Sequence, residues 1–375
     1  MSKCAVFRAD KYDDEILYAV VKKHFEAHGI AEDLSSASNV LIKPNLVADK
    51  EAAFSVTTNP RFVYAVIRCL KDFGVEKITV ADCPGGSLLL FSQMADVYRR
   101  TGYSFLGEFA SLNTDFDSSD VFGQADFANG KFNIINAVAH ADYIINVAKL
   151  KTHNLTGITV GVKNLFGCIP GMQKPAFHAK YPSKADFSNM LVELAATVKP
   201  DFTLVDAVDI MEGNGPTNGK KRHLGVTFSS RDVFTLDKFI AEILDIPPEK
   251  VSTLSAAEKK GLIGTAEGVG DTDFTPQTPI LLPDSVRAET AGGKIGAKIN
   301  TLFTKLNDAL FMSCPQMNEK CVLCKKCVAT CPAGALSLQG EKIILNKNKC
   351  IGCLCCDEVC TNAAVDIKRR IKRKR

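Results

Sequence analysis

The residues with the clearest chemical pattern are cysteines near the C-terminus. They form two sets with the same spacing, C-x2-C-x2-C-x3-C, offset by 29 residues: Cys321, Cys324, Cys327 and Cys331, then Cys350, Cys353, Cys356 and Cys360. This spacing lets one loop place three thiolates around a cubane while the fourth cysteine reaches the neighbouring cluster. It therefore predicts two 4Fe-4S clusters, one held by Cys321, Cys324, Cys327 and Cys360 and the other by Cys350, Cys353, Cys356 and Cys331.

Two departures leave alternatives open. Cys355 is an additional thiol in the second loop, so it could replace Cys356 as a ligand, and Thr361 follows the second set where Pro332 follows the first. Zinc is the competing metal, but zinc ligands typically come as two separated pairs for one ion. The segment resembles the bacterial two-cluster ferredoxins, which implies electron transfer with a redox protein such as a ferredoxin, a flavodoxin or a reductase. Cys314 fits neither set.

Cysteine usage also divides the chain. Four of the 14 cysteines lie in the first 313 residues and ten in the last 62. No apolar run approaches the roughly 18 to 20 residues that cross a bilayer, and the charged N-terminus lacks a signal peptide's apolar region. We therefore expect a cytoplasmic protein without a membrane span, whose reduced thiols ligate metal instead of forming disulfides.

The net charge of +4 comes from the last eight residues. The segment 368–375 holds seven basic residues, and without them 39 basic residues face 42 acidic ones, a net charge of −3. No aromatic and basic groove accompanies this tail, so nucleic acid is not an expected partner. We interpret it as a disordered tail that serves solubility or docking.

Any substrate chemistry must lie upstream, where apolar runs alternate with helical periodicity. We expect strands at Lys3–Arg8, Asn39–Ile42, Lys77–Ala81, Tyr143–Val147, Phe202–Val205 and Leu224–Phe228, and helices at Asp13–Glu26, Pro60–Phe73, Asp186–Val198 and Val233–Leu244. The first strand, helix and second strand read as a β-α-β unit. The fold class is α/β, a largely parallel sheet with helices on both faces, plus a small C-terminal α+β ferredoxin-like domain.

Polar loops follow four of these strands, where an α/β sheet binds its ligands. They contain Lys43 and Asn45; Asp82; Lys149, Lys151 and His153; and Asp206 and Glu212. Ordinary turn formation explains any one loop, but four together favour a site. Asp82, Glu212 and His153 are the candidates for proton transfer.

An anion site is the hypothesis for the lysines. In an extended backbone Lys149, Lys151 and His153 lie on one side, and two ammonium groups on one face are better offset by an anion than left on a solvated edge. We expect Thr152, Asn154 and Thr156 to cap a following helix whose N-terminus adds to this site. Lys163 and Asn164 lie further along it.

A family resemblance becomes visible at these residues. The motifs LIKPNL, ADCPGG, ADYIINVAKLKTH, TGITVGVKNLFGCIPG, His178 and LVDAVDIMEGNGPTNG, in this order, resemble the bacterial and archaeal family catalogued as domain of unknown function 362. The resemblance covers roughly residues 3–270. Its motif positions are Lys43, Asn45, Asp82, Gly85, Gly86, Lys149, Lys151, His153, Lys163, Asn164, His178, Asp206, Glu212 and Gly215. It implies a C-terminal ferredoxin-like module and a role in anaerobic metabolism, and it implies no particular reaction.

The expected domain plan has four parts: an α/β domain at 1–270, a linker with a candidate helix at 271–313, a two-cluster 4Fe-4S domain at 314–367 and a basic tail at 368–375. Two functions fit it. The first is an oxidoreductase whose α/β domain binds a small anionic metabolite, or a cofactor such as flavin, through Lys43, Asn45, Lys149, Lys151, Lys163 and Asn164. The second is a non-catalytic electron carrier, or a metal or cofactor assembly factor, whose α/β domain docks a partner.

Overall fold

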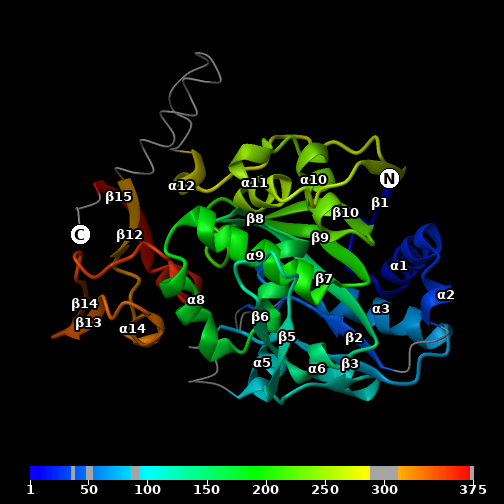
Figure 1. The fold of residues 1–375 in the computed structure, drawn as a ribbon, viewed down its shortest axis with the longest axis horizontal. Coiled ribbons are helices and arrows are strands. Elements are labelled where there is room, and N and C mark those ends of the chain that lie inside the picture. Colours follow the sequence, from blue (N-terminus) through cyan, green and yellow to red (C-terminus); the bar gives the residue numbers. More distant parts are fainter. Residues whose placement is uncertain (35–38, 48–53, 86–92, 288–310, 372–375) are drawn as a thin grey trace, which may run out of the picture.

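The computed structural model describes residues 1–34, 39–47, 54–85, 93–287 and 311–371. Its main feature is a nine-stranded sheet in the order β11-β1-β10-β9-β7-β2-β3-β4, with β8 paired to β7 (Figure 1). The strands are β1 (Ser2–Arg8), β2 (Val40–Lys43), β3 (Ile78–Val80), β4 (Ser111–Leu112), β7 (Tyr143–His153), β8 (Gly157–Thr159), β9 (Phe202–Glu212), β10 (Lys220–Ser230) and β11 (Ala266–Gly270). Within the described ranges, no helix is both long and apolar enough to cross a membrane.

The sheet is largely parallel, as the sequence predicts. Strands β9, β7, β2, β3 and β4 run parallel, whereas β10 runs antiparallel to both β1 and β9. The two strands of the predicted β-α-β unit, β1 and β2, are not neighbours in the sheet, because β10, β9 and β7 lie between them. The four strands predicted to end in polar loops, β9, β7, β2 and β3, are consecutive neighbours, so their carboxyl ends meet at one edge. For two of them the predicted end is wrong: β7 continues to His153 and β9 to Glu212, so the polar residues expected in those loops lie in the strands.

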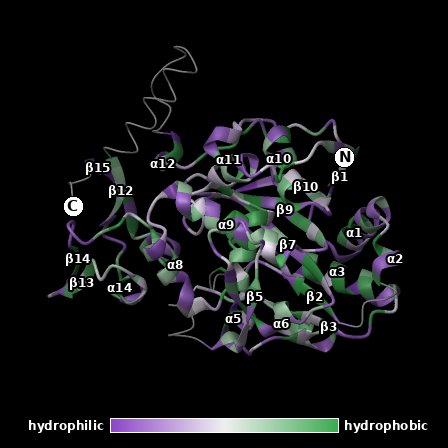
Figure 2. Cartoon of the chain, viewed as in Figure 1, coloured by the Kyte–Doolittle hydropathy of each residue, from purple (hydrophilic) through white to green (hydrophobic). Residues whose placement is uncertain are grey.

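Helices cover both faces of this sheet (Figure 1). Side chains of β2 alternate between two cores: Val40 and Ile42 pack with α1 (Asp14–His28) and α3 (Pro60–Asp72), and Leu41 packs with the layer that holds α9 (Lys184–Val198). Figure 2 shows hydrophobic colouring along these central strands. The period of two in the strand thus requires a helical layer on each side.

The remaining elements of the α/β domain are α2 (Ile30–Leu34), α5 (Met94–Thr101), β5 (Ser118–Phe122), β6 (Lys131–Ile135), α6 (Asn136–Ala139), α7 (Gly161–Asn164), α8 (Lys174–Lys180), α10 (Val233–Ile243), α11 (Ser252–Lys259) and α12 (Asp284–Arg287). Most of them are short, whereas α10 packs in a core with β1, β9 and β10. Side-chain oxygens cap the longer helices: Asp13 accepts the N–H groups of Glu15 and Ile16, and Asp232 caps α10 in the same way.

The helix expected after Lys151 is wrong. Strand β7 continues to His153 and turns back as β8, which pairs with it antiparallel, so Asn154–Thr156 form the turn. Thr152 donates its hydroxyl hydrogen to the Gly213 carbonyl at 2.8 Å instead of capping a helix. Helix α7 begins only at Gly161 and has four residues, so the helix that follows this turn is too short for the expected anion site at its N-terminus.

The C-terminal domain is a separate small unit with its own core (Figure 1). Strand β12 (Phe311–Met317) pairs antiparallel with β15 (Val365–Ile371), and β13 (Leu336–Gln339) forms the predicted hairpin with β14 (Lys342–Leu345). Two short helices, α14 (Lys326–Thr330) and α15 (Cys355–Glu358), follow the cysteine loops.

The predictions for the basic tail and for the linker have different outcomes. The first four residues of the expected basic tail, Lys368–Ile371, belong to β15, because hydrogen bonding to β12 continues to Phe311 opposite Ile371. The remaining residues 372–375, and the candidate helix that carries Ile295, Ile299, Leu302 and Leu306, lie outside the described residues.

Gly167 tests how tightly the loops pack at the sheet edge. A Cβ there would lie 1.9 Å from Asp82 Oδ1 and 2.5 Å from Lys43 Nζ, so both groups would have to move. We expect Gly167→Ala to lower the free energy of unfolding by about 1–3 kcal/mol, measured by urea denaturation under anaerobic conditions. Gly130→Ala is the matched control, because no atom lies within 4 Å of its added Cβ. Equal stability of the two variants would contradict this packing.

Candidate functional site

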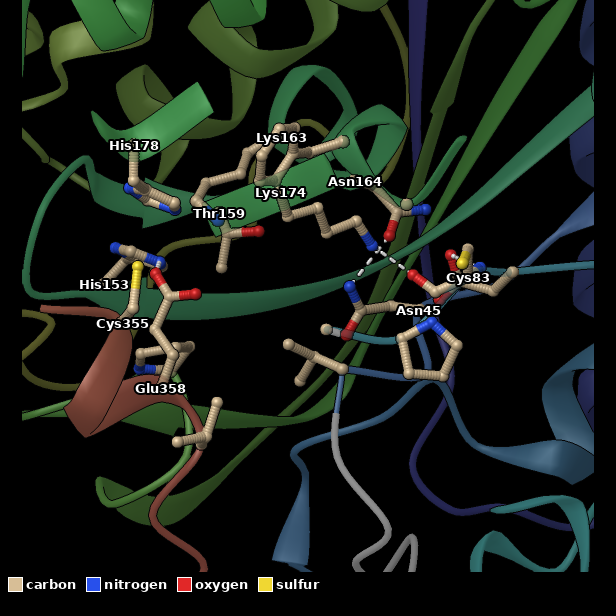
Figure 3. A pocket seen from close by; sticks show the side chains of 18 of the residues that line it. Asn45, Cys83, His153, Thr159, Lys163, Asn164, Lys174, His178, Cys355 and Glu358 are labelled. Carbon is tan, nitrogen blue, oxygen red and sulfur yellow. Dashed lines mark hydrogen bonds and ion pairs between the residues drawn. The ribbon is translucent and has the colours of Figure 1, made fainter. Parts of the chain in front are cut away.

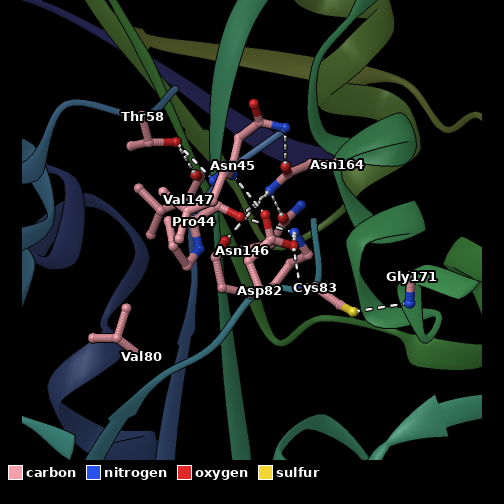
Figure 4. Close-up of polar contacts among 12 residues, drawn as sticks. Pro44, Asn45, Thr58, Val80, Asp82, Cys83, Asn146, Val147, Asn164 and Gly171 are labelled. Atoms are coloured by element: carbon pink, nitrogen blue, oxygen red, sulfur yellow. Dashed lines mark hydrogen bonds and ion pairs between the residues drawn. The ribbon is translucent and has the colours of Figure 1, made fainter. Parts of the chain in front are cut away.

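The loops after β2 and β3 are joined by a buried ion pair (Figure 4). Lys43 Nζ donates to Asp82 Oδ1 at 2.7 Å and to the Pro44 carbonyl at 2.8 Å, and both charged side chains are almost fully buried. The other oxygen of Asp82 accepts the N–H of Leu46 at 2.6 Å. Lys43 and Asp82 therefore neutralise each other and hold the two loops together.

Lys149 is neutralised in the same way. Its ammonium group donates to Asp206 Oδ2 and to the Tyr12 hydroxyl, both at 2.8 Å. Burial lowers the pKa of Lys149, and the Asp206 carboxylate opposes that effect. Glu212 is also paired, with Arg222 at 3.0 Å. The carboxylates predicted to converge therefore each bind a separate cation.

Lys151 has a different environment. Its buried ammonium group donates to Asn45 Oδ1 at 2.7 Å and to the Val56 carbonyl at 2.5 Å, both of them neutral oxygens. Burial, followed by the positive charges of Lys163 and Lys149, holds the pKa of Lys151 well below its usual value. A buried cation with neutral partners is costly unless an anion joins it.

A chain of amides fixes this geometry. Asn45 presents its oxygen to Lys151, so its nitrogen faces the other way and donates to Asn164 Oδ1 at 2.8 Å (Figure 4). Asn164 in turn donates to Asn146 Oδ1 at 2.7 Å, and Asn146 donates to the Gly161 carbonyl at 3.1 Å. Asn45 and Asn164, predicted as anion ligands, thus use these polar atoms to position Lys151.

Lys151 borders a small cavity. Both domains line this cavity, and Figure 3 shows Cys355 and Glu358 of the C-terminal domain together with residues of the α/β domain. We call it the interdomain cavity. The α/β domain contributes Asn45, Val47, Asp82, Cys83, Pro84, Gly85, Lys151, His153, Thr159, Lys163, Asn164, Phe166, Gly167, Lys174, Pro175, His178 and Pro216, and the C-terminal domain contributes Thr330, Cys355, Glu358 and Val359. Its volume of about 70 Å³ is enough for roughly five water-sized groups.

The interdomain cavity is positively charged. Lys163 and Lys174 place their ammonium groups 5.8 and 5.7 Å from the centre of the Phe166 ring, and Lys174 also donates to the Cys83 carbonyl. Among the described residues, the ion pairs around the cavity are Lys43–Asp82, Lys149–Asp206 and His153–Glu358. No carboxylate among the described residues forms an ion pair with the ammonium groups of Lys151, Lys163 or Lys174, although the charge of Lys163 is the strongest of the effects that outweigh burial and lower the pKa of Glu358.

His153 and Glu358 meet across the domain boundary (Figure 3). His153 Nε2 lies 3.0 Å from Glu358 Oε1, and His153 Nδ1 accepts the N–H of Leu155 at 3.0 Å. Nδ1 is thus an acceptor, so a neutral ring carries its proton on Nε2. Although Nε2 and Glu358 Oε1 are close, each is buried without a hydrogen-bond partner among the described residues. Burial, reinforced by Lys163, lowers the pKa of His153 to about 4, although Glu358 opposes the shift. Burial also lowers the pKa of His178 to about 4.

Helix α15 docks the C-terminal domain against the end of β7. Asp357, which is buried, accepts hydrogen bonds from the Asn154 side chain at 2.7 Å and from the Asn218 side chain at 3.2 Å. Burial raises the pKa of Asp357 to about 7. Because Asp357 and Glu358 directly follow Cys356, these contacts bring the second cysteine loop to the interdomain cavity.

The two cysteine loops have matching backbone geometry. Leu323 and Lys325 have positive φ angles of 55° and 63°, and their counterparts 29 residues later, Gly352 and Leu354, have 73° and 62°. Left-handed residues on both sides of the second cysteine curl each loop around one centre. The internal repeat in the sequence is therefore also a repeat in structure.

The fourth cysteines follow the same repeat. The N–H of Ala335 donates to Cys331 Sγ at 3.2 Å, and the N–H of Ala364 donates to Cys360 Sγ at 3.3 Å. The pKa of Cys327 rises to about 11, first through burial and then through the nearby thiols of Cys324, Cys360 and Cys321. Cys360 thus lies near the thiols of the first loop, and these thiols are the donors that a 4Fe-4S cluster takes; the exchange of fourth ligands between two clusters stays a prediction.

The other thiols separate into distinct environments. Cys356 packs in the core of the C-terminal domain, whereas Cys355 lines the interdomain cavity. Cys314 lies 3.9 Å from Cys350, sulfur to sulfur. Burial raises the pKa values of Cys83 and Cys168, the latter to about 12, so both remain protonated thiols. In the described ranges no group of three His, Cys, Asp or Glu side chains is arranged to hold a single metal ion. A 4Fe-4S cluster is larger than one ion, so its cysteine ligands lie further apart.

The sequence predicts part of this cavity and misses part of it. Of the predicted residues, Asn45, Asp82, Lys151, His153, Lys163 and Asn164 line it, whereas Lys43, Lys149 and Glu212 do not. Lys174 was not among the candidates, although it stands one helical turn before His178 on α8. Glu358 was also missed; the signal is that Asp357 and Glu358 occupy the positions of Val328 and Ala329 in the repeat. Gly86 lies outside the described residues.

Comparison with known proteins agrees with this division of the chain. The model of a family described as domain of unknown function (DUF362) matches residues 40–242, and that of a 4Fe-4S binding domain matches residues 315–337. The thylakoid-associated protein sll1697 of Synechocystis is 32% identical over 265 residues, 70% of this chain and 80% of its own length. Indolepyruvate oxidoreductase subunit IorA of Archaeoglobus fulgidus is 38% identical over 50 residues, 13% of this chain and 8% of that protein.

Among solved structures, the lactate racemase apoprotein of Thermoanaerobacterium thermosaccharolyticum is similar over 65% of this chain. The match spans 58% of that chain, with 15% sequence identity and a TM-score of 0.41.

The adjacent thiols Cys355 and Cys356 allow a matched test of ligation. We expect Cys356→Ser to lower the iron and sulfide content of anaerobically reconstituted protein from about eight atoms of each to about four. Cys355→Ser should keep the full content, because that side chain points to the interdomain cavity. The reverse outcome would assign the ligand to Cys355.

Proposed function

Because the chain belongs to the family described as domain of unknown function (DUF362), whose name states no reaction, we propose a function from its own site. The protein is an iron-sulfur oxidoreductase that exchanges electrons with a small anion bound in the interdomain cavity. The main support is that the Lys151 ammonium group is buried beside two neutral oxygens and borders a cavity that the second cysteine loop helps to close.

Two 4Fe-4S clusters complete the proposal. Cys321, Cys324, Cys327 and Cys360 hold one, and Cys350, Cys353, Cys356 and Cys331 hold the other. When bound, such clusters accept and release single electrons. The match of one 4Fe-4S domain at residues 315–337 supports the first cysteine loop as a cluster-binding segment, and the repeated backbone geometry supports the second loop.

The cavity selects its ligand by charge and by size. Lys151, Lys163 and Lys174 attract an anion, and they outnumber the two carboxylates among the described lining residues, Asp82 and Glu358. A volume of about 70 Å³ is well below the roughly 300–1,000 Å³ of pockets for drug-sized ligands. The ligand of the cavity is therefore an inorganic anion or a small carboxylate of a few atoms, and a flavin is too large for it.

His153 is the group proposed to move a proton. Its Nδ1 is occupied by backbone donors, so the proton on Nε2 is held at the cavity wall between the anion and Glu358. Asp82 and Glu212 take no such role in this proposal, because each is bound to a lysine or an arginine.

The alternative function is a non-catalytic electron carrier or assembly factor that docks a partner through its α/β domain. It predicts that no small anion affects the clusters. The Synechocystis relative is described as thylakoid-associated. For this protein we propose the cytoplasm, as expected from the sequence.

The test is the rate of cluster reoxidation in anaerobic protein with and without a panel of small anions. We expect at least one anion to change this rate in the native protein. Lys151→Met should weaken the apparent affinity for that anion by about 10- to 100-fold, because a charge-assisted hydrogen bond contributes about 1.5–3 kcal/mol. No change with any anion in the native protein would favour the carrier.

Stability provides the control for this variant. Removing the buried amine relieves its desolvation cost but leaves the Asn45 and Val56 oxygens without their donor, so Lys151→Met should change the free energy of unfolding by less than about 3 kcal/mol and leave the protein folded. Lys259→Met, at an exposed position on α11, should leave the anion effect unchanged.

A further inference from the structure

The C-terminal domain has a second concave surface between its two small sheets. We call it the basic groove; its volume is about 800 Å³. It is lined by residues of β12, β14 and β15 and of the first cysteine loop: Cys314, Pro315, Gln316, Met317, Asn318, Glu319, Cys321, Leu323, Glu341, Lys342, Ile343, Ile344, Leu345, Lys347, Lys368, Arg369 and Arg370. None of these residues lines the interdomain cavity.

The charge of the basic groove is positive. Five basic residues line it against two acidic ones, Glu319 and Glu341. Lys342, Lys347 and Lys368 are exposed. Arg370 is held in place by donating to the Lys347 carbonyl and to Met312 Sδ. Ordered cations on a concave surface attract an anionic partner and raise its rate of association.

Apolar side chains accompany these charges. Ile344 lines the basic groove and is 40% exposed, and Ile371 and Val322, which lie next to lining residues in the sequence, are 65% and 64% exposed. Exposed apolar residues with a charged rim are typical of protein interaction sites. A lipid surface is broad and flat, so a protein that can enter the groove fits these features better.

The position of the groove relates it to the cysteine loops. Cys321 of the first set lines the groove and Cys324 is exposed, whereas Cys355 and Glu358 of the second loop face the interdomain cavity. The two loops therefore present different surfaces, one to the outside and one to the cavity.

We propose that the basic groove is the docking surface for an acidic electron-carrier protein, which exchanges electrons with this chain beside Cys321. The inference rests on the proposed electron-transfer function, to which it adds the class of partner and the place of contact. In each exchange one electron passes between the carrier and the chain, so one is oxidised as the other is reduced.

Charge reversal tests this surface. The variant Lys342→Glu, Lys347→Glu and Lys368→Glu is compared with the control Lys22→Glu, Lys77→Glu and Lys259→Glu, three exposed positions on the α/β domain. The probe is a reduced flavodoxin of acidic isoelectric point. Its binding to cluster-loaded protein and the rate of cluster bleaching are measured at low and high salt.

We expect the groove variant to bind the flavodoxin at least tenfold more weakly and to be reduced at least tenfold more slowly at low salt. The control should match the native protein, and dithionite should reduce all three proteins fully, which shows that their clusters are intact. Equal flavodoxin binding by the two triple variants would overturn the proposal.

Two further measurements separate this proposal from other outcomes. Flavodoxin binding and reduction are measured without added anion, and the groove variant should keep the native effect of the anion on reoxidation, so loss of the anion effect and loss of docking are distinguishable. Vesicles of anionic lipid serve as the competing surface. If the native protein bound these vesicles through the groove lysines and did not bind flavodoxin, the groove would be a membrane contact and the proposal would be wrong.

Discussion

The arrangement of the site depends on a positive charge that the α/β domain buries without a matching carboxylate. Lys43 and Lys149 stand near the same sheet edge, yet each binds an aspartate, whereas Lys151 is held by an amide oxygen and a carbonyl oxygen. The free-energy cost of such a cation is offset when an anion enters the interdomain cavity. The amides of Asn45, Asn164 and Asn146 are organised around this one group.

The second constraint is the docking of α15. Asp357 reaches Asn154 and Glu358 reaches His153, at the end of the strand that also carries Lys151. The contact closes the cavity with residues that adjoin the second cysteine loop. The basic groove lies beside the first loop. The C-terminal domain thus has one face at the interdomain cavity and a separate face that carries the basic groove.

Much of the fold is local enough to be predicted from the sequence. Alternating apolar periods identified most strands and helices of the sheet, and cysteine spacing identified the ferredoxin-like repeat. The antiparallel insertion of β10 and the β7–β8 turn were not predicted, because strand order and a turn at Asn154 depend on contacts distant in sequence. Glu358 and Lys174 were missed for the same reason, because the cavity that they line forms only when the two domains pack together. Sequence could also not distinguish the paired Lys149 from Lys151, since the partner of a buried charge is set by the fold.

The central claim is that an anion beside Lys151 lies close to the second cysteine loop, and a redox titration tests it most directly. The reduction potentials are measured by spectroelectrochemistry with and without the anion that alters reoxidation. Added negative charge opposes the gain of an electron nearby, so the account predicts that the potential of one cluster falls more than that of the other. This shift should vanish in Lys151→Met. Identical potentials with and without bound anion would contradict the account.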